Sequence, residues 1–520
     1  MLAIAQSAVL AGIASSPVRV EVQAERGIPT FELVGLAEAA VRESRVRVKS
    51  ALAGVGVDIS EYRVTVNLAP ADVKKSGSSF DLAIALGTLV ALGALPEGSL
   101  EGVLVLGELS LNGGIQSLRG VVAHLLGAKK RGVARAIVPF ANEREAALVD
   151  GVEVELASTL GEVVEALAGR AALPKPRPAP ANLTRGPVDD LADVRGQHGA
   201  RRALEIAASG GHNIVMMGPP GAGKTMLARR LPGILPLLTR EEALEVIAIH
   251  GVAGLLGPSS DVIVERPFRA PHHTASDVAL VGGGETSRPG EVSLAHHGVL
   301  FLDELAELRR AALEALRQPL EDGSVTVCRM RMTVTFPARP MLVGATNPCP
   351  CGNYGDGTNR CHCSQEAIRL YRRRLSGPLL DRIDIHVVLP RVDLLELQTA
   401  KGGGESSTVV RARVERARTI QRDRFLAGEV SVQTNAHLAQ RDVERICKLD
   451  AKGRSVLAQA VERRGLSARA YGKVLRVART IADMEGATAV AAQHVVEAVG
   501  GRVLDRDQTN GRPISETDAA

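Results

Sequence analysis

Aromatic residues are scarce in this sequence. Among its 520 residues there is no tryptophan, and there are only 4 tyrosines and 7 phenylalanines. Proteins that hold single-stranded RNA by stacking its bases need clustered aromatic side chains. The composition therefore argues against a base-stacking nucleic-acid module.

The sequence also lacks a long apolar run and a disulfide framework. The longest apolar stretch, residues 82–95, is too short for a membrane span and contains two glycines, so it indicates a buried helix. The amino terminus has no basic segment of the kind that opens a signal peptide. Six cysteines in 520 residues are too few for a disulfide scaffold. We therefore predict a cytoplasmic protein with reduced thiols and no membrane attachment.

No strong excess of either charge marks the chain as a whole. It has 63 lysines and arginines against 58 acidic residues, a net charge of +5. Residues 1–170 carry 16 basic and 19 acidic side chains, a net −3, and the other 350 residues carry 47 and 39, a net +8. This modest basic excess permits binding to a polyanion such as DNA without requiring it.

Proline is concentrated in one short segment, which suggests how the chain divides into domains. Five prolines lie between residues 174 and 187, where they exclude a helix or a central strand. We therefore predict an extended linker over residues 171–188. It separates an amino-terminal domain, residues 1–170, from a larger part. The mixed strand and helix patterns of that first domain indicate an α+β fold.

The larger part begins as an α/β unit and continues as a helical one. Three apolar strands separated by helical segments are predicted at residues 214–217, 299–302 and 341–345. This alternation is typical of a parallel sheet covered by helices, which we place within residues 189–400. Residues 401–504 form a helical domain whose arginine-rich segment, 411–424, indicates a solvated face, with DNA contact as the alternative. The polar tail, residues 505–520, is predicted to be disordered.

A glycine-rich motif follows the first of these strands. It fits the pattern G-x-x-x-x-G-K-S/T, and its residues are Gly218, Pro219, Pro220, Gly221, Ala222, Gly223, Lys224 and Thr225. The glycines let backbone N–H groups close around phosphates, Lys224 can reach the β- and γ-phosphates, and the Thr225 hydroxyl can hold Mg²⁺. The alternative is a chance glycine-rich turn. A strand before the motif and a helix after it favour a site for ATP and Mg²⁺.

Polar side chains end the next two strands. Asp303 follows the strand at residues 299–302, where a carboxylate can hold Mg²⁺ through water. Glu304 beside it suits a base that polarises the attacking water. Alone, this acidic pair would indicate a helix cap, but the upstream phosphate motif favours catalysis. Asn347 follows the next strand and is placed to hold the same water from the other side.

Four of the six cysteines lie within 15 residues, at Cys349, Cys351, Cys361 and Cys363. Four thiolates suit the tetrahedral coordination of Zn²⁺. The spacing CxC is tighter than the usual CxxC, and the alternative is four reduced, solvent-facing thiols. We predict a structural zinc site here. The adjacent histidines at 272–273 and 296–297 are expected to form hydrogen bonds rather than a second metal site.

Two β-branched runs flank a basic tripeptide before the third strand. Residues 325–327 and 333–336 indicate the strands of a hairpin whose tip carries Arg329 and Arg331. Two arginines at a loop tip can follow the phosphate backbone of DNA without distinguishing its bases. The alternative is a solvated surface hairpin.

With these motifs, the chain resembles the YifB/ComM family of magnesium chelatase-like AAA+ ATPases. The resemblance rests on the phosphate motif, on residues 299–304 and 344–347, and on the Cys cluster. Three longer stretches narrow it, at residues 266–274, 288–291 and 376–384. It implies an α/β fold, in which a P-loop core with a parallel sheet is followed by a helical lid. It also implies a homo-hexameric ATPase that acts on single-stranded or branched DNA, as ComM proteins drive branch migration during natural transformation.

The resemblance assigns roles to two further arginines and to the hairpin. Arg382 matches an arginine finger that enters the ATP site of the neighbouring subunit. Its alternative role is a salt bridge with Asp381 or Asp384. Arg469 matches a second sensor arginine that touches the γ-phosphate from the lid. In related ring helicases a hairpin at this place points into the central pore, so the same position is expected for Arg329 and Arg331.

The amino-terminal domain resembles the proteolytic domain of Lon, a ribosomal S5 domain 2-like fold. The resemblance covers residues 74–86 and 107–143, in which Ser79 matches the nucleophile. Val122 stands where Lon has its catalytic lysine. Because valine cannot take a proton from serine, we predict no peptidase activity. The domain is then expected to be a scaffold, a DNA-contact surface or a tier that stabilises the ring.

Two other functions remain open from the sequence. A magnesium chelatase-like ATPase that remodels a protein partner would share the ATPase core and both arginines. That subunit lacks a Lon-like domain and the CxC pairs, and both are present here. An ATP-dependent peptidase is the other alternative, and Val122 argues against it. The sequence therefore favours a DNA motor. Neutralising the arginines of the hairpin should abolish stimulation by DNA in a DNA motor but not in a chelatase motor.

Overall fold

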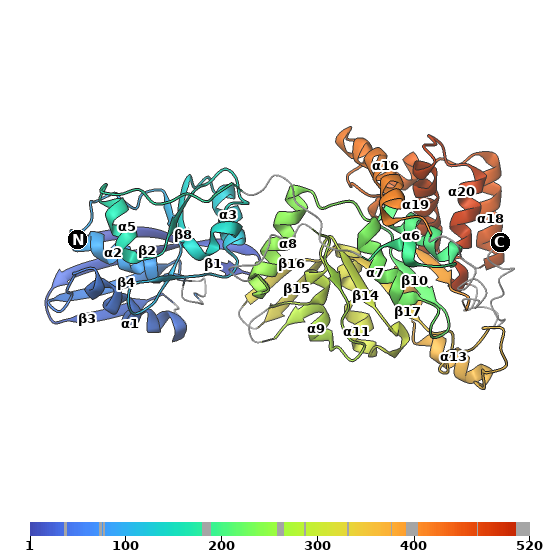
Figure 1. Cartoon of the computed structure of the whole chain (residues 1–520), viewed down its shortest axis with the longest axis horizontal. Coiled ribbons are helices and arrows are strands. Elements are labelled where there is room, and N and C mark those ends of the chain that lie inside the picture. Colours follow the sequence, from blue (N-terminus) through green and yellow to red (C-terminus); the bar gives the residue numbers. More distant parts are fainter. Residues whose placement is uncertain are drawn as a thin grey trace.

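The computed structural model is elongated, with the parts of the chain arranged in line (Figure 1). An amino-terminal α/β unit lies at one end, a second sheet lies in the middle, and the helices after residue 404 lie at the other end. The structure describes residues 1–35, 39–71, 75, 79–178, 189–256, 265–284, 288–329, 332–375, 377–391, 404–464 and 466–505.

The amino-terminal unit is built on a seven-stranded sheet with the order β3-β4-β2-β1-β5-β8-β9. Its strands are β1 (Leu2–Ala11), β2 (Ala14–Arg26), β3 (Thr30–Val34), β4 (Tyr62–Ala69), β5 (Val103–Val105), β8 (Arg135–Pro139) and β9 (Glu153–Ala157). Its longer helices are α1 (Ala39–Gly54), α2 (Asp81–Ala91), α3 (Val121–Lys130) and α5 (Leu160–Leu167). All of α2 is buried, so the prediction of a buried helix in this stretch is confirmed. Alternating burial along β1 and β2 packs one face of the sheet on α2.

The central sheet is parallel, with the order β11-β14-β17-β10-β18. Its strands are β10 (Ile214–Met217), β11 (Phe268–Arg269), β14 (Val299–Leu302), β17 (Met341–Thr346) and β18 (Ile385–Val388). Every residue of β10, β14 and β17 is buried, because apolar clusters cover both faces of the sheet. This explains the continuous apolar runs in the sequence and confirms the predicted parallel α/β core.

The helices around this sheet are α6 (His198–Gly210), α7 (Lys224–Ile234), α8 (Arg240–Ala253), α9 (Asp277–Val281), α11 (Arg310–Ala315), α12 (Arg317–Asp322), α13 (Gln365–Arg373) and α14 (Gly377–Leu380). The predicted hairpin is present as β15 (Ser324–Arg329) and β16 (Met332–Pro337), which pair antiparallel. Its root is buried through Val325, Val334 and Phe336. The alternative of a wholly solvated hairpin is therefore excluded for its root.

A bundle of helices closes the carboxy-terminal end: α16 (Ser407–Leu426), α17 (Gln440–Ile446), α18 (Ala451–Arg464), α19 (Ala468–Met484) and α20 (Ala492–Gly500). Arginines of α16 face inward. Arg418 donates to the Ala208 carbonyl at 2.8 Å, and Arg413 pairs with Glu205 at 2.5 Å. Arg411 and Arg424 also contact groups on other helices. The solvated-face interpretation is wrong for these four side chains: Arg411, Arg413 and Arg418 join the bundle to the core, and Arg424 pairs with Asp483 within the bundle.

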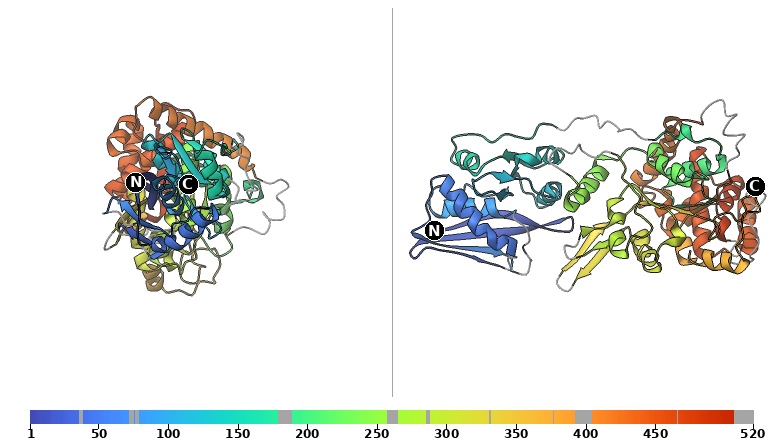
Figure 2. Two further views of the ribbon diagram at one scale, coloured as in Figure 1. Left: turned by 90° about the vertical axis from the view of Figure 1, so that its left-hand side faces the viewer. Right: turned by 60° about the horizontal axis from the view of Figure 1, so that its bottom comes forward.

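Among the described residues, the amino-terminal unit contacts the core along α8 and at the hairpin (Figures 1 and 2). Helix α3 packs on α8, where Ile247 and Ala248 join the apolar cluster of α3. Gly12, in the β1–β2 turn, has a φ of +64°, and a Cβ there would lie 2.4 Å from Cγ1 of Val334. The glycine is needed both for the turn and for this close approach to the hairpin.

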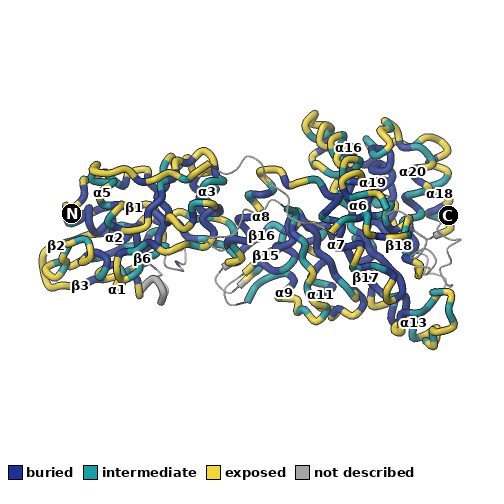
Figure 3. The backbone as a smooth tube through the Cα atoms, in the orientation of Figure 1, coloured by how far each residue is buried: buried dark blue, intermediate teal, exposed yellow. Residues whose placement is uncertain are grey.

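Exposed residues gather on the loops and outer helix faces, while the middle strands of the central sheet are buried and β1 and β2 alternate between buried and exposed residues (Figure 3). The described part of the proline-rich segment, residues 171–178, forms neither a helix nor a strand. It runs beside β9, where the Leu156 N–H donates to the Pro174 carbonyl at 2.8 Å. Residues 179–188, and the predicted tail after Asp505, lie outside the described residues. Among the described helices, none has both the length and the hydropathy needed to cross a membrane.

Candidate ATP site

The glycine-rich motif forms a loop between the end of β10 and the start of α7. Gly221 and Gly223 have φ values of +80° and +89°, in the left-handed region that glycine adopts without strain. A Cβ on Gly218 would lie 2.7 Å from the Leu389 carbonyl oxygen. The glycines therefore let the loop turn tightly against the neighbouring strand and present backbone N–H groups at the start of α7.

Lys224 lies in the first turn of α7 and points back into this loop. Its Nζ donates to the Gly218 carbonyl at 2.5 Å and to Oδ1 of Asn347 at 3.0 Å. Burial lowers the pKa of Lys224, and the nearby carboxylates of Asp303 and Glu304 oppose that shift. Two residues that the sequence placed in one site, Lys224 and Asn347, are thus in direct contact although 123 positions separate them.

Asp303 lies directly beside Thr225. The Thr225 hydroxyl donates to Oδ2 of Asp303 at 2.9 Å, and the Glu304 N–H donates to the other carboxylate oxygen, also at 2.9 Å. A hydroxyl and a carboxylate are the oxygen donors that Mg²⁺ takes beside a nucleotide phosphate. The chemistry and proximity of these residues therefore fit a magnesium ion.

Glu304 has a left-handed backbone, with φ +49° and ψ +46°. This conformation costs about 1–2 kcal/mol for a residue with a Cβ. It accompanies an ion pair in which Oε2 of Glu304 lies 2.9 Å from Nδ1 of His273. The sequence predicts hydrogen bonding for His273 without naming a partner, and the tertiary contact identifies that partner as Glu304.

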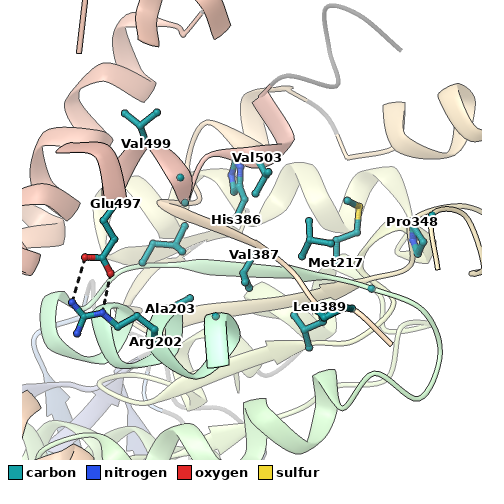
Figure 4. A pocket seen from close by; sticks show the side chains of 18 of the residues that line it. Arg202, Ala203, Met217, Pro348, His386, Val387, Leu389, Glu497, Val499 and Val503 are labelled. Atoms are coloured by element: carbon teal, nitrogen blue, oxygen red, sulfur yellow. Dashed lines mark hydrogen bonds and ion pairs between the residues drawn. The ribbon is translucent and has the colours of Figure 1, made fainter. Parts of the chain in front are cut away.

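A cavity of about 880 Å³ opens beside the start of the loop, at Gly218 and Pro219. Its wall includes Val387 in the outermost strand β18 and Leu389 just after it, together with residues of α6, α18 and α20 (Figure 4). Arg202 on α6 pairs with Glu497 on α20 at 2.8 Å, which joins the core to the helical bundle. The cavity is mainly apolar with a few polar groups, which is typical of a small-molecule pocket.

Arg382 lies at the opposite edge of the sheet from the phosphate loop. Strands β10 and β18 are parallel, with Ile214 opposite Ile385 and Met217 opposite Val388. The loop follows Met217, whereas Arg382 precedes Ile385. Four strand residues at about 3.3 Å each separate the two edges by about 10 Å or more. Arg382 is therefore directed away from the ATP site of its own chain.

Arg382 and Arg469 meet at one acidic side chain that the sequence did not single out. Nη2 of Arg382 lies 2.5 Å from Oε1 of Glu321, and Nη2 of Arg469 lies 3.8 Å from the same oxygen. Asp384, one alternative partner considered for Arg382, pairs with Lys473 at 2.7 Å. Ser467 donates to Asp381 at 3.3 Å, a second contact between the same two segments.

The four clustered cysteines converge beside the phosphate loop. Their sulfur atoms all lie within 4.8 Å of one another, and three of the separations are 3.4, 3.7 and 3.8 Å. Four sulfurs at about 2.3 Å from a tetrahedral zinc would be about 3.8 Å apart. Cys349, Cys351, Cys361 and Cys363 thus fit a zinc ion. Gly352 in this cluster is packed so tightly that a Cβ would lie 2.6 Å from Cδ of Pro220.

The second histidine pair is built for hydrogen bonds. His296 and His297 both place Nε2 within 3.0 Å of Oε2 of Glu245. Nδ1 of His296 accepts the Arg339 N–H at 3.0 Å, so a neutral His296 carries its proton on Nε2 and donates it to Glu245. That nitrogen has no lone pair for a metal. The geometry supports the hydrogen-bonding interpretation of this pair.

The structure describes neither Arg331 nor the side chain of Arg329, so both predicted DNA contacts lie outside the described residues. In the Lon-like unit, Val122 is fully buried in the first turn of α3, and Ser79 is partly exposed. The buried Asp81 near Ser79 is held by Ser44 and by Arg47, whose Nε donates at 2.6 Å. Burial raises the pKa of Asp81, and these two partners oppose the rise.

Three family models match the chain. They are described as magnesium chelatase, subunit ChlI, over residues 190–397, subunit ChlI of Mg-chelatase over 20–142, and the ChlI carboxy-terminal region over 404–502. The chain is 42% identical to the competence protein ComM of Haemophilus influenzae over 513 residues, 97% of this chain and 98% of ComM. It is 41% identical to YifB of Escherichia coli over 505 residues, again 97% and 98% of the two chains.

A shorter similarity covers the amino-terminal unit. Lon protease 2 of Bacillus subtilis is 27% identical over 146 residues, 27% of this chain and 26% of that protein. The similarities to ComM and YifB extend over nearly the whole length of all three chains, and the phosphate loop and parallel sheet are those of an AAA+ core. The chain therefore belongs to the ComM and YifB family of magnesium chelatase-like AAA+ proteins.

Proposed function

We propose that this protein is an ATP-hydrolysing ring motor that acts on DNA as a branch-migration helicase. One observation carries the proposal: the phosphate loop and the two arginines lie at opposite edges of the same sheet. A complete ATP site then needs the loop of one subunit and the arginines of the next. Head-to-tail contacts of this kind close into rings, and six subunits is the number that the family resemblance implies.

We call the end of the sheet where the parallel strands finish the carboxyl edge, and the end where they begin the amino edge. In this proposal the residues of the carboxyl edge bind and activate the nucleotide. Lys224 holds the β- and γ-phosphates, and the cavity beside Gly218 receives the base and ribose. Thr225 and Asp303 hold Mg²⁺, which would neutralise charge on the transferred phosphoryl group. Glu304 accepts the proton of the attacking water, and Asn347 orients that water.

The amino edge completes the neighbouring site. Arg382 and Arg469 both project there, so both act on the ATP of the next subunit, Arg382 as the arginine finger and Arg469 as the second sensor. A cation at this position stabilises the charge that develops on the phosphate oxygens. This arrangement makes hydrolysis a property of the assembled ring.

The hairpin is proposed as the contact with DNA, through Arg329 and Arg331 at its tip. Its root is buried, and Gly12 of the amino-terminal unit packs against it, so the tip projects from a root that is packed against the rest of the protein. The relative ComM of Haemophilus influenzae is a competence protein, which supports a role in natural transformation. The Lon-like unit is proposed to brace the ring without peptidase activity, because Val122 has no base to offer.

A structural zinc ion is proposed at the four cysteines. The sulfur separations suit tetrahedral coordination, and the cluster packs on Pro220 of the phosphate loop. The cluster follows Asn347 directly in the chain. A bound metal would therefore stabilise both the loop and Asn347.

The proposal is tested by ATP hydrolysis of the full chain. The rate is compared without DNA, with single strands, with duplex and with a four-way junction, and Lys224→Ala supplies the blank. A DNA motor is expected to be stimulated several-fold, most strongly by the junction. A rate that ignores every DNA would contradict the proposal. It would favour a chelatase-like ATPase that acts on a protein partner, in line with the matching family models.

A further inference from the structure

Glu321 contacts two arginines that lie far apart in the sequence. It lies near the end of α12 (Arg317–Asp322), and one of its carboxylate oxygens lies near the guanidinium groups of both Arg382 and Arg469. The two arginines come from the segment before β18 and from the start of α19. One side chain thus joins three segments that are far apart in the sequence.

These contacts put Glu321 in competition with a phosphate. A guanidinium group binds carboxylate and phosphate oxygens through the same donors. The shorter contact, at 2.5 Å to Arg382, is a charge-assisted hydrogen bond, and only 13% of that arginine side chain is exposed. When the γ-phosphate of a neighbouring subunit meets these arginines, some of their donors must turn away from Glu321.

The chain connects Glu321 directly to the hairpin. Helix α12 ends at Gly323, which has a φ of +66°, and β15 begins at the next residue. The Ala338 N–H donates to the Gly323 carbonyl at 2.9 Å, which closes the root of the hairpin. A Cβ on Gly323 would lie 2.7 Å from Nε of Arg339, so this junction has little free space. A displacement of α12 would therefore move the hairpin root instead of being absorbed in a loose linker.

We propose that Glu321 is a positioning residue that couples the two arginines to the hairpin. In the absence of a neighbouring ATP it holds Arg382 and Arg469 together. When ATP engages the arginines, Glu321 is released and α12 shifts the root of the hairpin. This inference rests on the proposed function, because it requires the arginines to serve the ATP of the next subunit.

The test measures the hairpin without using DNA. Hydrogen exchange of residues 324–337 in the assembled full chain is compared with and without a non-hydrolysable ATP analogue. Wild type is expected to change its exchange rates at least threefold when the analogue binds. Glu321→Gln keeps the size of the side chain but loses its charge, so this response should be lost while the affinity for the analogue does not fall.

Two further variants separate coupling from folding. Glu321→Asp keeps the charge and is expected to recover at least part of the hairpin response. Glu314→Gln is the matched control, because Glu314 on α11 also pairs with an arginine and its side chain is 38% exposed against 46% for Glu321. The control should respond like wild type. Thermal unfolding of every variant shows whether a lost response reflects a lost fold.

The outcomes are distinct. A hairpin response that survives in Glu321→Gln, or that disappears equally in Glu314→Gln, overturns the role of Glu321. The absence of any response in wild type overturns it as well. A wild type whose ATPase ignores DNA, but whose hairpin still responds through Glu321, contradicts the proposed DNA function and leaves the coupling intact.

Discussion

The two edges of the central sheet differ in how they are built. At the carboxyl edge, Lys224 and Thr225 come from one contiguous motif, and Asp303 and Asn347 lie at the ends of the adjacent strands. At the amino edge, Arg382 and Arg469 are brought together by Glu321 from an unrelated helix. The residues of the carboxyl edge can be predicted from the sequence, because they follow predicted strands. Those of the amino edge are brought together only by tertiary packing.

This difference has a functional consequence. In the proposed function, the carboxyl edge would bind a nucleotide, and the amino edge carries cations that the nucleotide of the same chain would not meet. A single chain then carries two half-sites that face opposite directions. Substitutions at both edges can test whether these two half-sites complement each other.

Arg382→Ala should reduce ATP hydrolysis by at least about 1,000-fold, the usual value of an arginine finger. The decisive measurement is a mixture with Lys224→Ala. If the arginine acts on the next subunit, random mixing restores about a quarter of the interfaces and some activity returns. If each variant stays inactive when mixed, although both assemble with wild type, the two edges do not complement each other.

Glu304→Gln should reduce the turnover number by about 100-fold, because a positioned base is removed from the attacking water. The KM for ATP should change little, since Lys224 and Thr225 are untouched. Steady-state kinetics separates the two parameters. A large rise in KM with normal turnover would instead assign Glu304 to nucleotide binding, and the carboxyl edge would lose its proposed base.

Cys351→Ser should remove zinc and lower hydrolysis about tenfold, because the cluster supports Pro220 and Asn347. Metal analysis of the purified protein should find one zinc per chain in wild type. The variant Cys447→Ser should keep that zinc, since Cys447 lies apart from the cluster in the helical bundle. If the wild-type protein contains no zinc and is fully active, the prediction is wrong, and the four thiols support the phosphate loop without a metal.

Asp384→Asn should change the turnover number less than the other three substitutions. It should instead lower the free energy of unfolding, because Asp384 stabilises the packing at the amino edge. Asp384 is buried, and Lys473 and His212 keep its pKa below the ordinary value although burial alone would raise it. Removing its charge should cost about 3 kcal/mol of the free energy of unfolding. Urea unfolding at pH 7 measures this loss.

The sign of the pH effect at Asp384 follows from that lowered pKa. The carboxylate adds stability above the pKa of an unfolded aspartate, about 3.9, and this stability is lost as the pH falls below that value. The difference in the free energy of unfolding between wild type and Asp384→Asn should therefore become smaller as the pH falls from 5 to the acid limit of folding. A constant gap across this range would show that the charge of Asp384 is not what holds the amino edge.

Much of the fold was predictable because its patterns are local. The buried strands β10, β14 and β17, and the apolar helix α2, follow from continuous apolar runs of different lengths. The ordered hairpin followed from two β-branched runs. The environment of the arginines of α16 was predicted wrongly. The sequence is the same whether an arginine side chain faces water or reaches a carbonyl group of α6, as that of Arg418 does.

By itself, the sequence determined the residues of the phosphate loop, the strand-ending positions of Asp303 and Asn347, and the clustering of four cysteines. These depend on spacing along the chain, and parallel strands bring their carboxyl ends to one edge. Three contacts emerge only in the tertiary structure: His273 with Glu304, Gly352 of the cysteine cluster with Pro220, and Glu321 with two distant arginines. Such contacts depend on how helices and loops pack in three dimensions, and no periodicity or spacing along a chain records that packing.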